Sequence, residues 1–182
     1  MITRRPLLNA SLAALFAIAA PFALASELPA DVAAKVEKAK KRLSEIAADP
    51  ALVAAVREAN GKDVGGMTNG KWSDLADNDP AVKALLSTKA STLIVKLEGA
   101  NDNLTKLLLR DQKGNFVAGS IKPLLFNNAA RPQFSNALKG QNWSAAEIKP
   151  DTTTQVPSVQ VGVPVLDGGK PIGVLQAGVI AK

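Results

Sequence analysis

The stretch 159–180 has the pattern of a long β-hairpin, and this pattern limits what the rest of the chain can form. Valine recurs at every second position from Val159 to Val165, which places β-branched side chains on one face of a strand. The following Asp167-Gly168-Gly169 contains residues that tolerate positive φ, so the chain can reverse and return to Ile180. We expect the valine face to lie at the centre of the hydrophobic core.

The turn also predicts the register of this hairpin. If the two glycines occupy its centre, Val165 lies opposite Ile172 and the branched residues form one continuous buried face. The other face then carries mostly small side chains, namely Gln160, Gly162, Pro164, Gly173, Leu175 and Ala177. Such a face has room for a packed helix or for a bound molecule, and both occupants remain open.

Residues 1–25 have the pattern of a secretory signal peptide. Arg4-Arg5 form a basic start, residues 12–20 are an uninterrupted apolar run, and Ala23-Leu24-Ala25 is a small-x-small cleavage pattern. The paired arginines also fit the twin-arginine export pattern loosely, so both export routes remain open. We expect cleavage after Ala25 and a periplasmic mature chain. A retained membrane anchor is the alternative, although the apolar run is short for a bilayer span.

The composition excludes several kinds of chemistry. The chain has no cysteine and no histidine, so disulfides, thiol nucleophiles, thiolate metal sites and the commonest general base are all excluded. Removal of the signal peptide lowers the net charge from +6 to +4, and the scattered basic residues form no stripe that would suit nucleic acid. We expect a protein that is not an enzyme and that holds neither a metal nor another cofactor.

Residues 26–99 are predicted to form a helical lead-in. An amphipathic helix is expected over 31–48, where apolar residues recur at spacings of three and four. Asp49-Pro50 and Asp79-Pro80 each combine an N-cap with proline at the first helical position. They predict a second helix, and a third that continues without a break to Gly99.

The connection between the second and third helices, residues 62–78, is polar and rich in glycine. It reads as a loop with at most one helical turn, attached to the core by Trp72.

Residues 104–181 are predicted to form an antiparallel sheet. The segments 104–110 and 116–119 flank a turn and indicate a second hairpin. Residues 121–130 should cross irregularly, 131–140 should form a short helix, and a further strand should begin at Trp143. The fold class is therefore α+β, with N-terminal helices packed on a central sheet of five strands in one domain over 26–182.

Four segments in this order resemble the extracytoplasmic, PAS-like sensor domains called Cache domains. They are Asp49 to Asn60, Leu107 to Ala118, Arg131 to Gly140, and Val163 to Leu175. The resemblance implies a long N-terminal helix along an antiparallel sheet, with a small-molecule pocket beneath the segment that joins the second and third strands. In this chain that segment is 121–143.

The chain also departs from the family. It ends at Lys182, directly after the last predicted strand, so we expect no output module and a membrane-bound receptor or kinase as the partner. The tyrosines with which amino-acid-binding members hold an amino group are missing from the pocket segment, so amino acids are not favoured as ligands.

Arg131 is the first candidate ligand contact. A cation at the N-terminus of a helix opposes the helix dipole, and an anionic ligand would offset that cost. Arginine also binds carboxylates through two parallel hydrogen bonds. An arginine held by a protein carboxylate or by water is the alternative. Lys122 is a second candidate anion contact, with a solvated lysine as its alternative.

Four further residues of the segment are candidate ligand contacts. Phe126, Phe134 and Trp143 can wall a pocket or belong to the core, and Asn127 can orient a ligand or cap a turn. These residues predict a sensor-type domain that binds a small organic anion. The alternatives are an interaction or structural module whose pocket is filled by its own side chains, and a hydrolase without histidine or cysteine.

The signal peptide gives the first testable prediction. Mass spectrometry of the exported protein should find an N-terminus at Ser26, because the small residues Ala23 and Ala25 suit signal peptidase. An N-terminus at Met1 in a protein recovered from the membrane fraction would contradict it.

Overall fold

The computed structural model describes residues 28–182, so the predicted signal peptide and its cleavage site lie outside the described part. The helices are α1 (Ala30–Ala47), α2 (Pro50–Asn60), α3 (Asn69–Asp74), α4 (Pro80–Leu86), α5 (Lys89–Gly99), α6 (Pro132–Ser135) and the 3-10 helix η1 (Ala137–Lys139). The strands are β1 (Leu104–Asp111), β2 (Phe116–Gly119), β3 (Trp143–Ser144), β4 (Lys149–Pro150), β5 (Pro157–Asp167) and β6 (Lys170–Ile180). Helices thus precede strands, as predicted.

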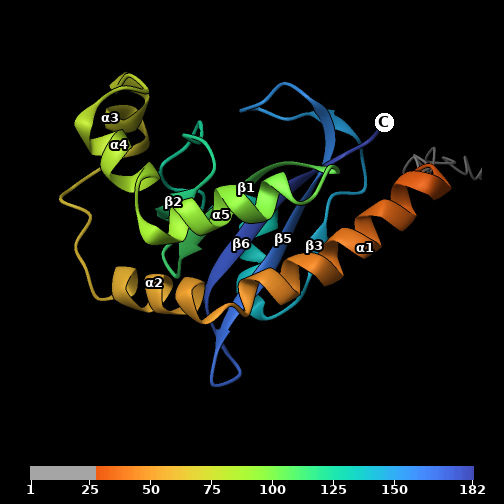
Figure 1. Cartoon of the computed structure of the whole chain (residues 1–182), viewed down its shortest axis with the longest axis horizontal. Helices are drawn as coiled ribbons and strands as arrows, with labels where there is room; N and C mark the ends of the chain where they lie inside the picture. The colour runs from red at the N-terminus through yellow and green to blue at the C-terminus, as the bar shows by residue number, and fades with distance from the viewer. Residues whose placement is uncertain (1–27) are drawn as a thin grey trace, which may run out of the picture.

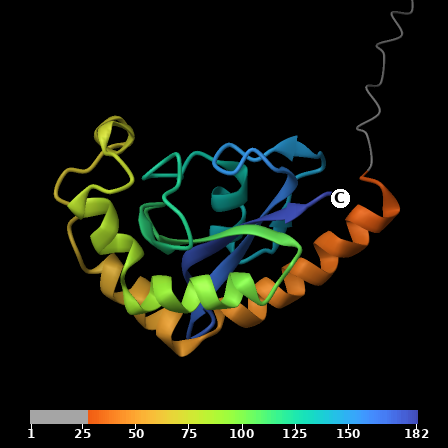
Figure 2. The same cartoon turned by 45° about the horizontal axis from the view of Figure 1, so that its top comes forward.

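The strands form one antiparallel sheet in the order β2-β1-β6-β5-β3, and β4 pairs with β5 outside this path. Two short strands, β3 and β4, replace the single strand predicted from Trp143. The long helix α1 crosses one face of the sheet, and α2 and α5 extend the same layer (Figure 1). Figure 2 shows this helical layer below the sheet and the segment that follows β2 above it. The α+β class is confirmed.

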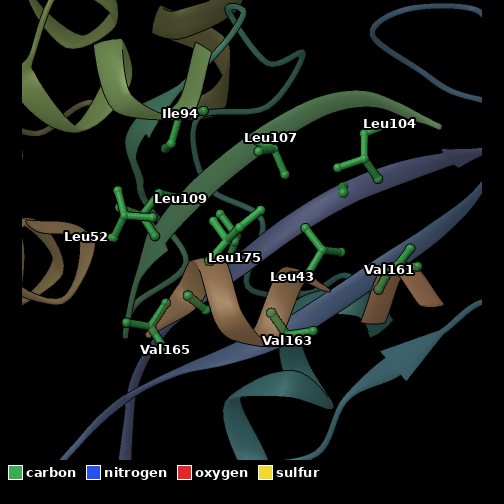
Figure 3. Packing of buried hydrophobic residues seen from close by; sticks show 14 of the residues in the cluster. Leu43, Leu52, Ile94, Leu104, Leu107, Leu109, Val161, Val163, Val165 and Leu175 are labelled. Carbon is green, nitrogen blue, oxygen red and sulfur yellow. The ribbon is translucent and has the colours of Figure 1, made fainter. Parts of the chain in front are cut away.

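The main core lies between the helical layer and the sheet. Leu43 of α1, Leu52 of α2 and Ile94 of α5 are fully buried in one cluster with the valines of β5. Helices α1 and α2 pack on β5, whereas α5 packs on β1 and β2. Figure 3 shows these side chains converging with the leucines of β1 and with Leu175. Burial of each such side chain stabilises the fold by about 1.5–3 kcal/mol. The predicted role of the valine face is confirmed.

The predicted register of the hairpin is wrong by one residue. Gly168 and Gly169 do occupy the turn with φ of 56° and 81°, but Val165 lies opposite Gly173, and a bulge leaves Ile172 without a partner. Because side chains alternate across a strand, this shift exchanges the faces of β6. Leu175 and Ala177 therefore join the core, and Gln176 faces the other side.

The third predicted helix is in fact two helices, α4 and α5. The hydroxyl oxygen of Thr88 accepts a hydrogen bond from the Ser91 N–H at 3.0 Å, so Thr88 caps a new helix instead of continuing the first. The predicted caps at Asp49 and Asp79 are confirmed by hydrogen bonds of 2.8 Å from Ala51 and Ala81.

The connection between α2 and α4 contains one short helix, α3, as predicted. Its Trp72 is fully buried and donates a hydrogen bond of 2.8 Å to the Pro123 carbonyl oxygen. This contact ties the connection to the segment that follows β2. Between residues 28 and 182, none of the helices combines the length and apolar character that crossing a bilayer requires.

The contact between α6 and the sheet gives the second prediction. A Cβ atom on Gly162 would lie 1.9 Å from the Gln133 carbonyl oxygen, so Gly162→Ala should lower the free energy of unfolding by roughly 1–3 kcal/mol. Gly99→Ala is the control, because a Cβ there meets nothing within 4 Å. Urea unfolding measures both variants. A midpoint of Gly162→Ala equal to that of wild type would contradict the close packing of α6 on β5.

Candidate functional site

The predicted pocket segment, 121–143, lies over the face of the sheet that α1, α2 and α5 leave uncovered (Figure 2). Its short helices α6 and η1 pack on β5 and β6. The six predicted site residues therefore lie along this cover, but they do not gather around one space.

The two predicted cations differ in their surroundings. Arg131 is exposed at the start of α6, and its backbone N–H donates a hydrogen bond of 3.0 Å to the Asn128 carbonyl oxygen. The ammonium group of Lys122 donates to the Leu75 carbonyl oxygen at 2.7 Å, lies 3.8 Å from an Asp77 oxygen, and stands 5.5 Å from the Trp72 ring centroid. Lys122 thus holds the connection after α3 against the cover, while the Arg131 side chain points to solvent.

Three of the remaining predicted residues take part in internal packing or hydrogen bonding. The Phe126 ring packs 5.4 Å from the Trp72 ring, centroid to centroid, and Phe134 is buried in a small cluster with Ala137 and Val174. Asn127 donates hydrogen bonds to the Lys113 carbonyl oxygen at 2.9 Å and to Asn115 Oδ1 at 2.8 Å. Trp143 is half-buried on β3.

Sequence reasoning missed the residue with the most unusual surroundings, Arg110 on β1. Its side chain is 1% exposed, and its Nε donates to Gln176 Oε1 at 3.3 Å. Nη1 donates to the carbonyl oxygens of Leu125 at 3.1 Å and Phe126 at 2.5 Å. All these acceptors are neutral, and none of the ion pairs found within residues 28–182 includes Arg110.

Burial lowers the pKa of the Arg110 guanidinium to about 9, although the negative charge of Asp111 acts in the opposite direction. The group therefore stays cationic at neutral pH. Beside it, Gln176 Oε1 accepts a second hydrogen bond, of 2.9 Å, from Asn128 Nδ2. In the described part of the chain, Gln176 Nε2 and Asn128 Oδ1 are buried without a hydrogen-bond partner. The cluster thus contains a buried cation, an unpaired donor and an unpaired acceptor.

A buried ion pair lies on the same side of the sheet. Lys106 Nζ of β1 is 2.5 Å from Asp151 Oδ2, and both side chains are almost completely buried. Asp151 also accepts hydrogen bonds from the N–H groups of Thr153 and Thr154 and from Gln160 Nε2, at 2.8–2.9 Å. The pair therefore fastens the loop after β4 onto the sheet.

This environment shifts the pKa values of both members of the pair. Burial lowers the pKa of Lys106, and the hydrogen bond and charge of Asp151 offset part of that shift. Burial alone would raise the pKa of Asp151, but the hydrogen bonds and charge of Lys106 and the Thr153 and Thr154 N–H groups lower it below its ordinary value of 3.8. With Arg110, this face of the sheet carries two buried cations and one buried carboxylate.

One residue in the sequence points to this cluster. Arg110 interrupts the apolar run of β1, and its position, one residue after Leu109, places it on the opposite face from that core leucine. Gln176 was hidden by the wrong register, which assigned it to the buried valine face.

Within residues 28–182, no group of three or more carboxylate, histidine or cysteine side chains is arranged to hold a metal ion.

Comparison with known proteins gives structural similarity alone. No family model matches the sequence, and no curated protein matches it. Similar solved structures include the sensor domain of the V. cholerae histidine kinase DctB, with 16% identity and a TM-score of 0.43 over 82% of this chain and 57% of that chain. The ligand-binding domain of the Campylobacter jejuni chemoreceptor Tlp3, in complex with L-norvaline, has 11% identity and a TM-score of 0.44 over the same shares.

The E. coli DcuS sensor domain has 18% identity and a TM-score of 0.41 over 63% of this chain and 92% of that chain. The chain thus spans little more than half the length of the first two structures. By their descriptions, all three are sensor or ligand-binding domains.

The buried ion pair gives the third prediction. Asp151→Asn preserves the shape of the side chain but leaves Lys106 without a carboxylate, so the free energy of unfolding at neutral pH should fall by about 3–5 kcal/mol. The contribution of Asp151 is complete above its ordinary pKa of 3.8 and is lost as the pH falls through its lower folded pKa. The difference between wild type and variant should therefore narrow below about pH 4.

Urea unfolding at a series of pH values measures this difference. The exposed Asp102→Asn is the matched control and should behave as wild type. Equal stability of Asp151→Asn and wild type at pH 7 would mean that the pair contributes nothing.

Proposed function

We propose that this protein is an exported, sensor-type domain that binds a small organic anion on the polar face of its sheet. The observation that carries the proposal is the buried charge of Arg110, which has only neutral hydrogen-bond acceptors. Removing a guanidinium from water costs several kcal/mol unless an opposite charge compensates it. A ligand carboxylate would supply that charge and would accept the two parallel hydrogen bonds that arginine offers.

The neighbouring unpaired groups suggest the rest of the ligand. Gln176 Nε2 is a donor that suits the second oxygen of a carboxylate, whereas Asn128 Oδ1 needs a donor from its partner. A hydroxyl group beside the carboxylate would provide that donor. The class of ligand that fits both unpaired groups is a small carboxylate, in particular a hydroxycarboxylate.

Arg131 has a supporting place in this proposal. It follows Asn128 by one turn of chain, and its side chain is free to reach toward an incoming anion. Phe126, Asn127, Phe134, Trp143 and Lys122 then form the cover over the ligand rather than its charged contacts. A membrane-bound receptor or kinase remains the partner that we propose to detect the bound state.

A structural or interaction module is the second candidate function. It is favoured by the hydrogen bonds of Arg110 to Leu125 and Phe126, which fasten the cover to the sheet without a ligand. The two functions differ in one respect: a ligand-binding face gains stability from an anion, whereas a closed structural face does not.

Thermal unfolding with carboxylates, hydroxycarboxylates, amino acids, amines and purines gives the fourth prediction. A ligand at 100 times its dissociation constant should stabilise the protein by about 2.7 kcal/mol and raise the melting temperature. Gln176→Glu should raise the melting temperature without ligand, because it places a carboxylate beside Arg110, and should abolish anion binding. Gln141→Glu makes the same charge change at an exposed position and should do neither.

Arg131→Ala tests whether the Arg131 side chain contacts the ligand or stabilises the fold. It should weaken anion binding by roughly 2 kcal/mol and leave the melting temperature of the free protein unchanged, since the side chain is exposed. The structural module would be supported if Gln176→Glu lowers the melting temperature and no compound in the ligand series raises the melting temperature of the wild type.

A further inference from the structure

A cavity of about 680 Å³ lies between α2, the loop 61–68, the start of α5 and β2. In Figure 1 the loop swings outward from the end of α2 toward α3, to the left of β2. The cavity has the size of sites that bind small organic molecules, about 300–1,000 Å³. None of Arg110, Gln176, Asn128 or Arg131 lines it.

The small side chains of α2 create this space. Leu52 and Val56 point from α2 into the core, whereas the helix lines the cavity with Ala51, Ala54, Ala55 and Ala59. The facing walls are also apolar, and consist of Val64, Met67, Leu85, Ala90, Phe116, Val117 and Phe126. Since alanine cannot reach across to these walls, the helix leaves an apolar volume unfilled.

The charged groups at the cavity do not favour an ion. Glu58 and Lys62 pair at 2.5 Å, and the remaining exposed charges of the lining, Asp63 and Lys89, are of opposite sign. Deeper in the lining, the Asp111 carboxylate already accepts hydrogen bonds from the backbone N–H and side-chain amide of Asn115 at 2.8 and 2.9 Å. Its buried negative charge would repel an anion, and its lone pairs are largely used.

We propose that this cavity is a second binding site, for a neutral, apolar small molecule. The site is separate from the anion site, which requires Arg110. The apolar walls supply the binding energy through the hydrophobic effect, and the balanced rim gives no preference for a charged group.

Fluorescence titration with N-phenyl-1-naphthylamine, a neutral apolar probe, tests the proposal. The purified protein should show a saturable rise in probe emission that fits one site. The anionic probe 1-anilinonaphthalene-8-sulfonate has similar rings with an added sulfonate, and should bind at least about tenfold more weakly. Equal affinity for the two probes would overturn the assignment to a neutral ligand.

Cavity-filling variants locate the probe. Ala54→Trp places a large side chain into the cavity from an exposed position of α2, so it should weaken probe binding by at least about tenfold while the melting temperature stays level. Ala51→Trp, at a second exposed cavity position, should do the same. The matched control is Ala34→Trp on α1, an exposed residue outside the cavity, and it should bind as wild type.

Unchanged probe binding in both cavity variants, with intact melting temperatures, would overturn the cavity site. The anion experiments keep the two proposals separate: a carboxylate that raises the melting temperature should leave probe affinity within about a factor of two. If the protein binds a carboxylate but not the probe, the proposed cavity site is wrong and the proposed anion site stands. Direct competition between probe and carboxylate would overturn the separation of the sites.

Discussion

Burial of one face of the β5–β6 hairpin is the interaction on which the rest of the fold depends. Valines from β5 and the facing residues Leu175 and Ala177 of β6 supply an apolar surface that α1 and α2 cover, while α5 packs beside them on β1 and β2. The helices are amphipathic, so their stability comes largely from this contact and little from intrinsic helix propensity. The buried Arg110 and the Lys106–Asp151 pair lie on the opposite face of the sheet, and the cavity lies at the end of the helical layer.

The hairpin, the caps at Asp49 and Asp79 and the burial of Trp72 were predictable because each depends on residues close in sequence. The register of the β5–β6 hairpin was not predictable in this way. Gly173 lies where a Cβ would come within 2.3 Å of the Arg110 carbonyl oxygen and 2.7 Å of Val56 Cγ1. Only glycine fits between β1 and α2 at this point, so the bulge at Ile172 brings Gly173 there. That requirement arises from two elements distant in sequence, and local turn geometry does not reveal it.

The sequence predicted which segment covers the sheet, but not which charged residues are buried beneath that segment. The resemblance to Cache domains implied the cover, 121–143, and the helix dipole singled out Arg131. Yet α6 has only four residues, so its dipole is small, and Arg131 is exposed. Arg110 carries the stronger argument, because its burial results from the cover folding back over β1 and cannot be read from either segment alone.

Phe126 joins the two regions for which we propose ligands. Its carbonyl oxygen accepts a hydrogen bond from Arg110, and its ring forms part of the cavity wall beside Phe116. An anion that engages Nη1 of Arg110 would compete with this carbonyl, and the hydrogen bond from the Phe116 N–H at 2.8 Å would then hold Phe126 in place. That second bond anchors the ring to β2 and limits its movement. The coupling free energy between the two ligands should therefore be small, and by thermodynamic linkage it must be equal in both directions.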